Sequence, residues 1–435
     1  MRRVSVVLLC LVARVMSAEG PPVAGRWVVT VESFGVPAYY VMTLQQQGEK
    51  LTGDFDGDKL EGTVSGNEVK FRAQDERGGW EEATARLDGG TLRGSITLVF
   101  SDDAEHPRTQ PFTARRATLA PAGSPRRHEF VPTTFHRQFS PAIPPVLTIA
   151  PGDTVHTTTV DAGGTDEKGT RRVRGGNPQT GPFAVDGAAP GDTLVVKIEK
   201  LRLNRDYAIS DDGIVDRGLD SDLAVKMKDA GNGVRWHLDA QKGIATPEKP
   251  SEHLARYAVP VRPMLGCVAV APPPAQAPPG TGDSGRYGGN MDFNEIVEGV
   301  TLYLPVSVPG ALLYVGDGHA AQGDGELTGD ALETSMDVEF RVDVIPGPHR
   351  GGPRMENATH IMAMGLDGSI DGAFKSATSN MASWLFDRYK LTPSEVGQVL
   401  GTAAEYRISE VADRNAGVVL KISKERLATL APPAK

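Results

Sequence analysis

The stretch KLTGDFDGDKLEGTV, residues 50–64, contains two short segments of alternating apolar and polar residues separated by the pair Asp56-Gly57. Alternation with a period of two is typical of strands with one buried face, and an Asp-Gly pair favours a hairpin turn. A third segment of this kind, TLRGSI, follows at 91–96. We therefore predict a small antiparallel β-barrel or sandwich over residues 25–116, with a structural or binding role.

The composition extends this prediction to the whole chain. Its 435 residues exceed what one hydrophobic core usually organises, and its 50 glycines and 32 prolines indicate many turns between short strands. The formal net charge is −9, and no basic block is longer than the patch at 171–174. We therefore expect two or more domains of a mainly β protein and no nucleic-acid partner.

The N-terminus is typical of an export signal. Residues 1–18 hold a basic start, a short apolar run and small residues near a plausible cleavage site. The apolar run is shorter than the roughly twenty residues that a membrane-spanning helix needs, and no later stretch approaches that length. We expect an exported protein, periplasmic or extracellular, with no membrane span. Beyond this segment only Cys267 is a cysteine, so no disulfide framework is expected.

A larger domain is expected to follow. Residues 117–127 are rich in Ala, Pro, Gly and Arg and form a natural linker, which places the second domain at 128–430. Within it, two Pro-Gly-Asp-Thr turns introduce alternating runs with β-branched residues, a pattern that predicts strand entries. The expected strands are residues 155–160 and 194–198, and the apolar stretch 301–315 reads as a long strand buried on both faces.

Helical periodicity is confined to the C-terminal part. Residues 371–389 repeat apolar positions with a helical period, and Thr392-Pro393-Ser394-Glu395 is typical of a capped second helix. The proline-rich stretch 271–285 is expected to be a long surface loop, because proline lacks the N–H that a central strand needs. The apolar face expected for the first helix consists of Phe374, Ala377, Met381, Trp384, Leu385 and Tyr389.

Four polar islands in the second domain contain candidate metal ligands: Asp161, Asp292, the loop GDGHAAQGDGE at 316–326 with His319, and Glu333. A lone histidine is more often structural than a ligand. Zinc, however, accepts imidazole with carboxylate, and calcium takes carboxylate oxygen. His319, Asp292 and Asp161 would together supply such a mixed shell. The glycines of the loop fit a close approach to an ion and, equally well, a tight turn between two strands.

These motifs, taken together, resemble the acetamidase/formamidase family, which hydrolyses short aliphatic amides to a carboxylate and ammonia. The resemblance covers roughly residues 128–430. Its motifs are PPVLTIAPGDTV at 144–155, GPFAVDGAAPGDTLVVKI at 181–198, PMLGCVAVAP at 263–272, GGNMD at 288–292, LPVSVPGALLYVGDGHA at 304–320 and NMASWLFDRYKLTPSEV at 380–396.

The resemblance implies a mainly β fold with C-terminal helices, a homo-oligomer and a divalent cation near Asp292 and His319. It also matches Glu326 and Glu333 to acidic positions of the family. The appended N-terminal module and the export signal depart from the family pattern, as does the segment 162–180. Such a segment could reshape the substrate pocket, so the resemblance leaves the physiological amide open.

The mechanism that we expect is amide hydrolysis by metal-activated water. A zinc or calcium ion held by Asp292, His319 and Asp161 would activate the water, and Glu333 or Glu326 would transfer its proton to the leaving nitrogen. Two alternatives were weighed. Cys267 as a nucleophile is disfavoured, because its apolar surroundings predict a buried, inert thiol. The second is an exported binding protein whose acidic cluster holds a structural cation.

Overall fold

The computed structural model describes residues 22–33, 35–117, 124–227, 230–274 and 277–430. The expected signal peptide and most of the expected linker lie outside the described residues. The chain divides into two units, a smaller one that contains most of the described residues up to Arg116 and a larger one that contains those after it. Within the described ranges, no helix has both the length and the apolar character needed to cross a membrane.

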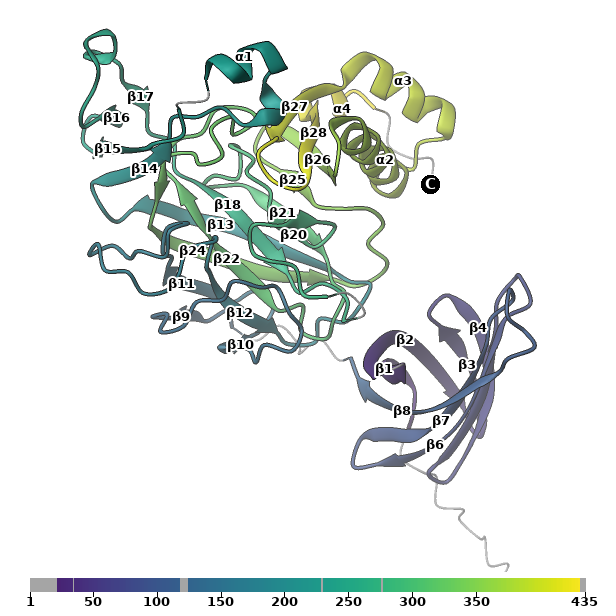
Figure 1. Cartoon of the computed structure of the whole chain (residues 1–435). Coiled ribbons are helices and arrows are strands. Elements are labelled where there is room, and N and C mark those ends of the chain that lie inside the picture. The colour runs from purple at the N-terminus through teal and green to yellow at the C-terminus, as the bar shows by residue number, and fades with distance from the viewer. Residues whose placement is uncertain (1–21, 34, 118–123, 228–229, 275–276, 431–435) are drawn as a thin grey trace, which may run out of the picture. The chain divides into compact units, whose positions relative to one another are not determined.

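The smaller unit is a closed barrel of eight antiparallel strands, which confirms the barrel prediction (Figure 1). Each strand pairs with the next, and β8 pairs with β1. The bounds are β1 (Gly25–Ser33), β2 (Val36–Gln47), β3 (Lys50–Phe55), β4 (Asp58–Ser65), β5 (Glu68–Gln74), β6 (Trp80–Asp88), β7 (Thr91–Val99) and β8 (Arg108–Arg116).

The repeated Leu-x-Gly motif has a packing role in this barrel. Leu51, Leu60 and Leu92 are fully buried. The glycine two residues after each leucine lies against the neighbouring strand: a Cβ at Gly53 or Gly94 would lie 1.8 or 2.0 Å from a backbone carbonyl oxygen. The motif therefore combines a core side chain with a position where the strands approach too closely for any side chain.

The larger unit contains two sheets that share one apolar core, with residues of both sheets in the same cluster. One sheet has eleven strands: β10 (Leu147–Ile149), β12 (Gln179–Val185), β14 (Tyr207–Asp211), β15 (Gly233–Asp239), β16 (Ile244–Pro247), β17 (Val259–Pro260), β18 (Met264–Val270), β19 (Ser284–Gly285), β20 (Gly288–Asn290), β22 (Leu313–His319) and β23 (Glu333–Thr334). The other has nine: β9 (Arg127–Glu129), β11 (Thr154–Thr158), β13 (Thr193–Leu203), β21 (Thr301–Pro305), β24 (Met336–Ile345), β25 (Arg354–Glu356), β26 (His360–Asp367), β27 (Glu405–Glu410) and β28 (Ala416–Ser423).

The stretch 301–315 is not the single strand that we predicted. It is divided between β21 and β22, which belong to different sheets. The break follows Pro305, and Ala311 and Leu312 adopt positive φ angles of 58° and 59° just before β22 begins. Of these two strands, β22 is buried along its whole length, whereas β21 alternates between buried and partly exposed residues. The apolar run therefore marks a crossing from one sheet to the other.

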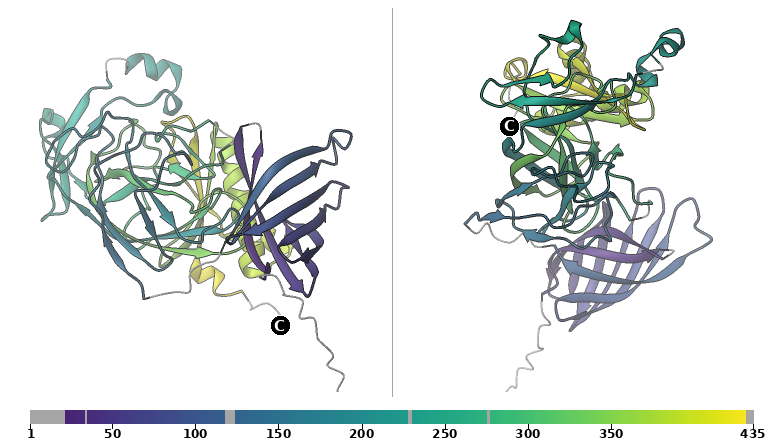
Figure 2. Two further views of the ribbon diagram at one scale, coloured as in Figure 1. Left: turned by 90° about the horizontal axis from the view of Figure 1, so that it is seen from below. Right: turned by 60° about the vertical axis from the view of Figure 1, so that its left-hand side comes forward.

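The C-terminal helices form as predicted. Helix α2 (Ile370–Tyr389) packs on β26 and β28, and α3 (Pro393–Ala403) begins with the expected capping box at Thr392. Of the predicted apolar face of α2, Phe374 is 44% exposed and packs on Tyr406 instead of the core. Two short helices, α1 (Ser221–Lys226) and α4 (Lys424–Leu427), complete the unit, and α1 lies at its periphery (Figures 1 and 2).

Candidate active site

The predicted residues Asp292, His319, Glu326 and Glu333 gather where β20, β18, β22 and β23 lie side by side in the eleven-stranded sheet. His319 ends β22 and Glu333 begins the adjacent β23, so the two residues face each other in register. Asp292 follows β20 by two residues, and Glu326 lies in the loop between β22 and β23. Asp317, also on β22, joins them. All five side chains are buried, with exposed fractions of 0 to 6%.

His319 is at the centre of the cluster. Its Nε2 atom lies 3.0 Å from Glu333 Oε1, 3.5 Å from Asp317 Oδ2 and 4.0 Å from Asp292 Oδ1. It belongs to two groups of possible metal ligands, one with Asp292 and Asp317 and one with Glu326 and Glu333. Within each group the ligand atoms lie within 4.8 Å of one another. At this spacing, several of these ligand atoms could contact the same metal ion.

Gln322 fixes the orientation of His319. The Gln322 Nε2 atom donates to the carbonyl oxygens of Asp292 and Ser409, so its Oε1 atom faces His319 Nδ1 at 2.8 Å. Because an amide oxygen only accepts, Nδ1 must carry the proton of this hydrogen bond. In the neutral imidazole the lone pair is then on Nε2, the nitrogen that faces the carboxylates, as a metal ligand requires.

Gly266 on β18 provides the space in which these groups meet. A Cβ atom at this position would lie 2.4 Å from Asp292 Oδ1, 2.5 Å from Asp317 Oδ2 and 3.0 Å from the His319 ring. Any side chain would therefore occupy the space between the acidic groups. This glycine leaves a cradle at the point on which three candidate ligands converge.

Several atoms of the cluster that could ligate a metal have no hydrogen-bond partner. Among the described residues, Asp292 Oδ1, Asp317 Oδ1 and Glu333 Oε2 are buried and accept no hydrogen bond, and His319 Nε2 faces carboxylate oxygens, of which Glu333 Oε1 is 3.0 Å away. Buried polar atoms are normally satisfied, and leaving one unpaired costs about 1–3 kcal/mol. Three such carboxylate oxygens around one imidazole, with Asp292 Oδ1 directly at the Gly266 cradle, fit a divalent cation.

The charges of the cluster lead to the same conclusion. Burial raises the pKa of Asp292 and of Glu326 well above the usual range, and it raises that of Glu333 to about 8. Burial alone would lower the pKa of His319, but Glu333 and Asp317 raise it well above its ordinary value. The carboxylates thus outnumber the one imidazole, and without a cation the cluster retains protons. A bound cation would replace them.

Backbone strain is concentrated at the same place. Asp292, Asp317 and Glu326 have positive φ angles of 40°, 59° and 45°, and nearby Asn177 has one of 50°. Such angles are uncommon outside glycine and persist only where the surroundings impose them. The fold holds three acidic side chains of the cluster in place at the expense of backbone conformation, as is typical of functional sites.

The structure does not bring Asp161 into the cluster. Its carboxylate forms an ion pair with Arg205 at 2.7 Å, and both side chains are buried. The same carboxylate accepts a hydrogen bond from the Thr165 N–H at 2.8 Å. Asp161 therefore has a structural role between β11 and β13, and Asp317 stands where we expected an additional ligand.

Two asparagines that the sequence analysis missed support the acids. Asn177 Nδ2 donates to Asn290 Oδ1 at 3.0 Å and to Asp317 Oδ2 at 3.3 Å. Asn290 Nδ2 in turn donates to Asp292 at 2.6 Å and to Asp413 at 2.8 Å. Asn290 could have been inferred from its motif, and Asn177 from its place in the unusual segment 162–180. Asp413 carried no sequence signal.

Other loop residues have contacts of their own. Asp324 forms an ion pair with Arg407 and accepts a hydrogen bond from Asn294 at 2.9 Å. The Gly325 N–H donates to the carbonyls of Ile408 and Ser409, so it is not available to an oxyanion. Gly316 and Gly318 lie within β22, where a Cβ would lie 2.6 Å from Gln179 Oε1 and 2.3 Å from Met336 Cγ, so these two glycines allow close packing of the strand.

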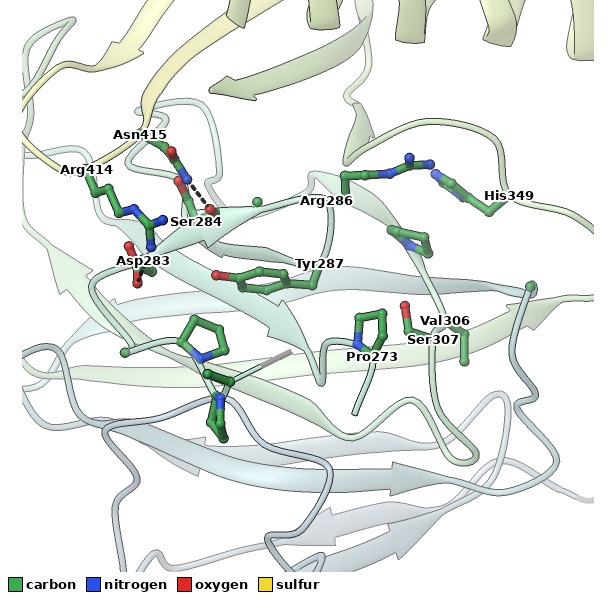
Figure 3. A pocket seen from close by; sticks show the side chains of 17 residues that line it. Pro273, Asp283, Ser284, Arg286, Tyr287, Val306, Ser307, His349, Arg414 and Asn415 are labelled. Atoms are coloured by element: carbon green, nitrogen blue, oxygen red, sulfur yellow. Dashed lines mark hydrogen bonds and ion pairs between the residues drawn. The ribbon is translucent and has the colours of Figure 1, made fainter. Parts of the chain in front are cut away.

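A cavity elsewhere in the larger unit is separate from the cluster. It measures about 860 Å³ and is lined in part by the proline-rich loop. Figure 3 shows Arg286 and His349 on one side of Tyr287, with Arg414 and Asp283 on the other. Its lining includes none of the candidate ligands.

Comparisons with known proteins show the family of the larger unit. A model of the family described as Acetamidase/Formamidase matches residues 125–277 and 275–362. The chain is 24% identical over 265 residues to the formamidase of Methylophilus methylotrophus, covering 48% of this chain and 64% of that protein. The curated relative is thus matched over less than two thirds of its length.

Solved structures are matched more fully. The acetamidase structure from Yersinia enterocolitica is 28% identical with a TM-score of 0.61, and the match covers 71% of this chain and 95% of that one. The acetamidase from Bacillus halodurans is 27% identical with a TM-score of 0.59, over 70% and 99% of the two chains. These matches extend the likeness from the motifs to the fold.

Proposed function

Because the chain belongs to the acetamidase/formamidase family, we propose that it is an amidase that hydrolyses small non-peptide amides to a carboxylate and ammonia. The observation that carries this proposal is the set of buried, unpaired carboxylate oxygens around His319, with Asp292 Oδ1 at the Gly266 cradle. An arrangement so unfavourable in isolation is explained if a ligand completes it.

Asp292, Asp317 and His319 are the residues that would hold a divalent cation, since their donor atoms converge on the cradle. One imidazole with two carboxylates is a donor set typical of zinc and is compatible with calcium or manganese. When bound, the cation would polarise the amide carbonyl and lower the pKa of a water molecule toward about 7.

Glu333 is the best placed proton carrier. Its Oε1 atom accepts a hydrogen bond from the Ala331 N–H at 3.1 Å, whereas its Oε2 atom is buried and unpaired. One oxygen is thus held in position while the other can take a proton from water and pass it to the departing nitrogen. Glu326, which lies in the same ligand group, is the alternative carrier.

The surroundings disfavour catalysis by the thiol. Cys267 is fully buried, and burial together with Asp317 and Asp292 raises the pKa of its thiol well above the usual range. A thiol that stays protonated is a poor nucleophile. Water, deprotonated with the help of Glu333, is therefore the nucleophile in this proposal.

The test measures ammonia release from formamide, acetamide and propionamide by the purified protein. We expect Asp292→Asn and His319→Gln to lower kcat/KM by at least about a hundredfold while circular dichroism shows an intact fold. Asp324→Asn is the matched control, because Asp324 lies in the same loop but pairs with Arg407. Wild-type rates in His319→Gln would refute the proposal. A protein that binds the cation yet releases no ammonia would instead be the exported binding protein.

A further inference from the structure

A second cavity, of about 460 Å³, adjoins the candidate active site. We call it the aromatic cavity. Strands β14, β15 and β17 contribute Asp211, Trp236 and Val259 to its wall, and the loop between β22 and β23 contributes Gln322 and Ala331. Its volume is far larger than acetamide requires and falls in the range typical of small-ligand pockets.

The aromatic cavity shares its wall with the catalytic groups. Gln322 holds the Nδ1 atom of His319 at 2.8 Å, and the Ala331 N–H donates to Glu333 Oε1 at 3.1 Å. One residue therefore separates the cavity from each of these two groups. A substrate whose amide reached the cluster could extend its remaining atoms into this cavity.

Two aromatic rings form one side of the cavity. The Trp236 and Tyr257 rings lie with their centroids 6.2 Å apart at an interplanar angle of 63°. Trp236 is held in place because its indole N–H donates to Ser210 Oγ at 3.0 Å. Faces of tryptophan and tyrosine attract organic cations, most strongly where water is partly excluded.

Two carboxylates contribute the charge of the cavity. Asp211 and Asp330 both line it, and the lining residues that the structure describes include no lysine, arginine or histidine. No ion pair is recorded for either carboxylate within the described ranges. Burial, and then the charge of Asp211, raises the pKa of Asp330. The two acids thus lack a cationic partner in a cavity that already presents aromatic rings.

We propose that the aromatic cavity binds the positively charged end of the substrate, so that the preferred amides carry an ammonium or guanidinium group on the acyl chain. The carboxylates would neutralise that group, and the rings of Trp236 and Tyr257 would contact its alkyl portion and its charge. This inference rests on the proposed amidase function and names its substrate class.

The experiment compares 6-aminohexanamide with heptanamide, its uncharged counterpart of the same length. We expect kcat/KM to be at least about tenfold higher for the cationic amide in the wild-type protein. Asp211→Asn and Asp330→Asn should each lower this ratio severalfold, and Trp236→Leu should lower it through loss of the ring. Asp222→Asn removes one negative charge from the exposed helix α1, outside the cavity, and should leave the ratio unchanged.

Heptanamide cleaved as efficiently as 6-aminohexanamide would overturn the inference, as would a preference that survives both aspartate substitutions. Either result leaves the amidase function intact. If no amide is hydrolysed at all, the proposed function fails, and calorimetry then tests the cavity by itself. Tighter binding of 6-aminohexanamide than of heptanamide, lost in Asp211→Asn, would support the cavity, and equal binding would refute it.

Discussion

The barrel and the larger unit are both antiparallel β structures, but they treat buried polar groups differently. Every polar residue that is buried within the described ranges lies in the larger unit. The one non-glycine residue of the described barrel with a positive φ is Asp56, at a hairpin turn, whereas Asp292, Asp317 and Glu326 adopt such angles inside a buried cluster. Among the described residues, the barrel has buried unpaired side-chain atoms only at Glu81 and Gln110, whereas the larger unit gathers strained and unpaired acidic groups in one cluster.

The largest expected effect comes from adding one methyl group at Gly266 in the larger unit. The same addition in the barrel is its counterpart. Gly266→Ala puts a carbon within 2.5 Å of the carboxylates of Asp292 and Asp317. We expect the loss of cation binding and a fall in kcat/KM of at least about a hundredfold, since supporting changes at a metal site already cost 10- to 100-fold. Metal analysis and the ammonia assay measure both effects.

The matched substitution in the barrel is Gly94→Ala, whose new carbon would lie 2.0 Å from the Thr84 carbonyl oxygen. It should destabilise the barrel by about 1–3 kcal/mol without changing kcat/KM. Equal activity losses in the two variants would contradict the separation of roles.

Removal of the cation should also distinguish the units. A ligand present at 100 times its Kd stabilises the unit that binds it by about 2.7 kcal/mol. A chelator should therefore lower the unfolding temperature of the larger unit and leave that of the barrel unchanged. Scanning calorimetry with and without chelator measures this, and a parallel shift of both transitions would argue against a cation confined to the cluster.

Gln322→Leu tests the orientation of His319. The substitution removes the acceptor at 2.8 Å that keeps the proton on Nδ1, so the lone pair is no longer directed toward the carboxylates. We expect cation affinity to fall by about 10- to 100-fold, with Gln322→Glu restoring part of it because a carboxylate accepts the same hydrogen bond. Unchanged affinity in Gln322→Leu would show that other contacts orient the ring.

The smallest expected effect is an opposite pH dependence of two carboxyl groups, Glu81 in the barrel and Asp153 in the larger unit. In the barrel, burial followed by the charges of Asp58 and Asp75 raises the pKa of Glu81 to about 7. The stabilisation that this gives is complete below the unfolded pKa of about 4.5 and is lost as the pH rises through 7. Because Glu81 is partly exposed, we expect a loss of only about 1 kcal/mol.

At Asp153 in the larger unit the sign is reversed, in contrast to the buried cluster, where burial raises the pKa values of Asp292, Glu326 and Glu333. Burial opposes ionisation of Asp153, but hydrogen bonds from His128 and from the Ala150 and Arg126 N–H groups lower its pKa to about 2. Its stabilisation is complete above the unfolded pKa of about 4 and is lost as the pH falls through 2. Unfolding measured from pH 2 to 8 in the wild-type protein, Glu81→Gln and Asp153→Asn checks both signs, because each substitution should abolish the contribution of its own carboxyl group and leave the other unchanged.

Local patterns in the sequence predicted much of the fold. The barrel hairpins and the capping box at Thr392 depend on residues close together in the chain, which is why they could be predicted. The division of 301–315 between two sheets could not, because it depends on which partners β21 and β22 find. Periodicity describes burial along a segment and carries no information about the sheet that buries it.

The candidate site, like the fold, could be predicted from the sequence only in part. Asp292, His319 and Glu333 lie in sequence motifs that predicted their place in the cluster. Asp161 also lies at the end of a predicted strand, but its carboxylate pairs with Arg205 instead. Asp413 reaches the site through Asn290, 123 residues away in sequence. Such contacts depend on tertiary packing, which one sequence does not display.

The most direct test of the account follows ammonia release from acetamide while zinc is titrated into chelator-treated protein. We predict that activity is absent without zinc, rises in proportion to the zinc bound and stays absent in Asp292→Asn at every zinc concentration. Full activity in the zinc-free wild-type protein, or zinc-dependent activity that Asp292→Asn retains, would contradict the claim that the buried cluster holds the catalytic cation.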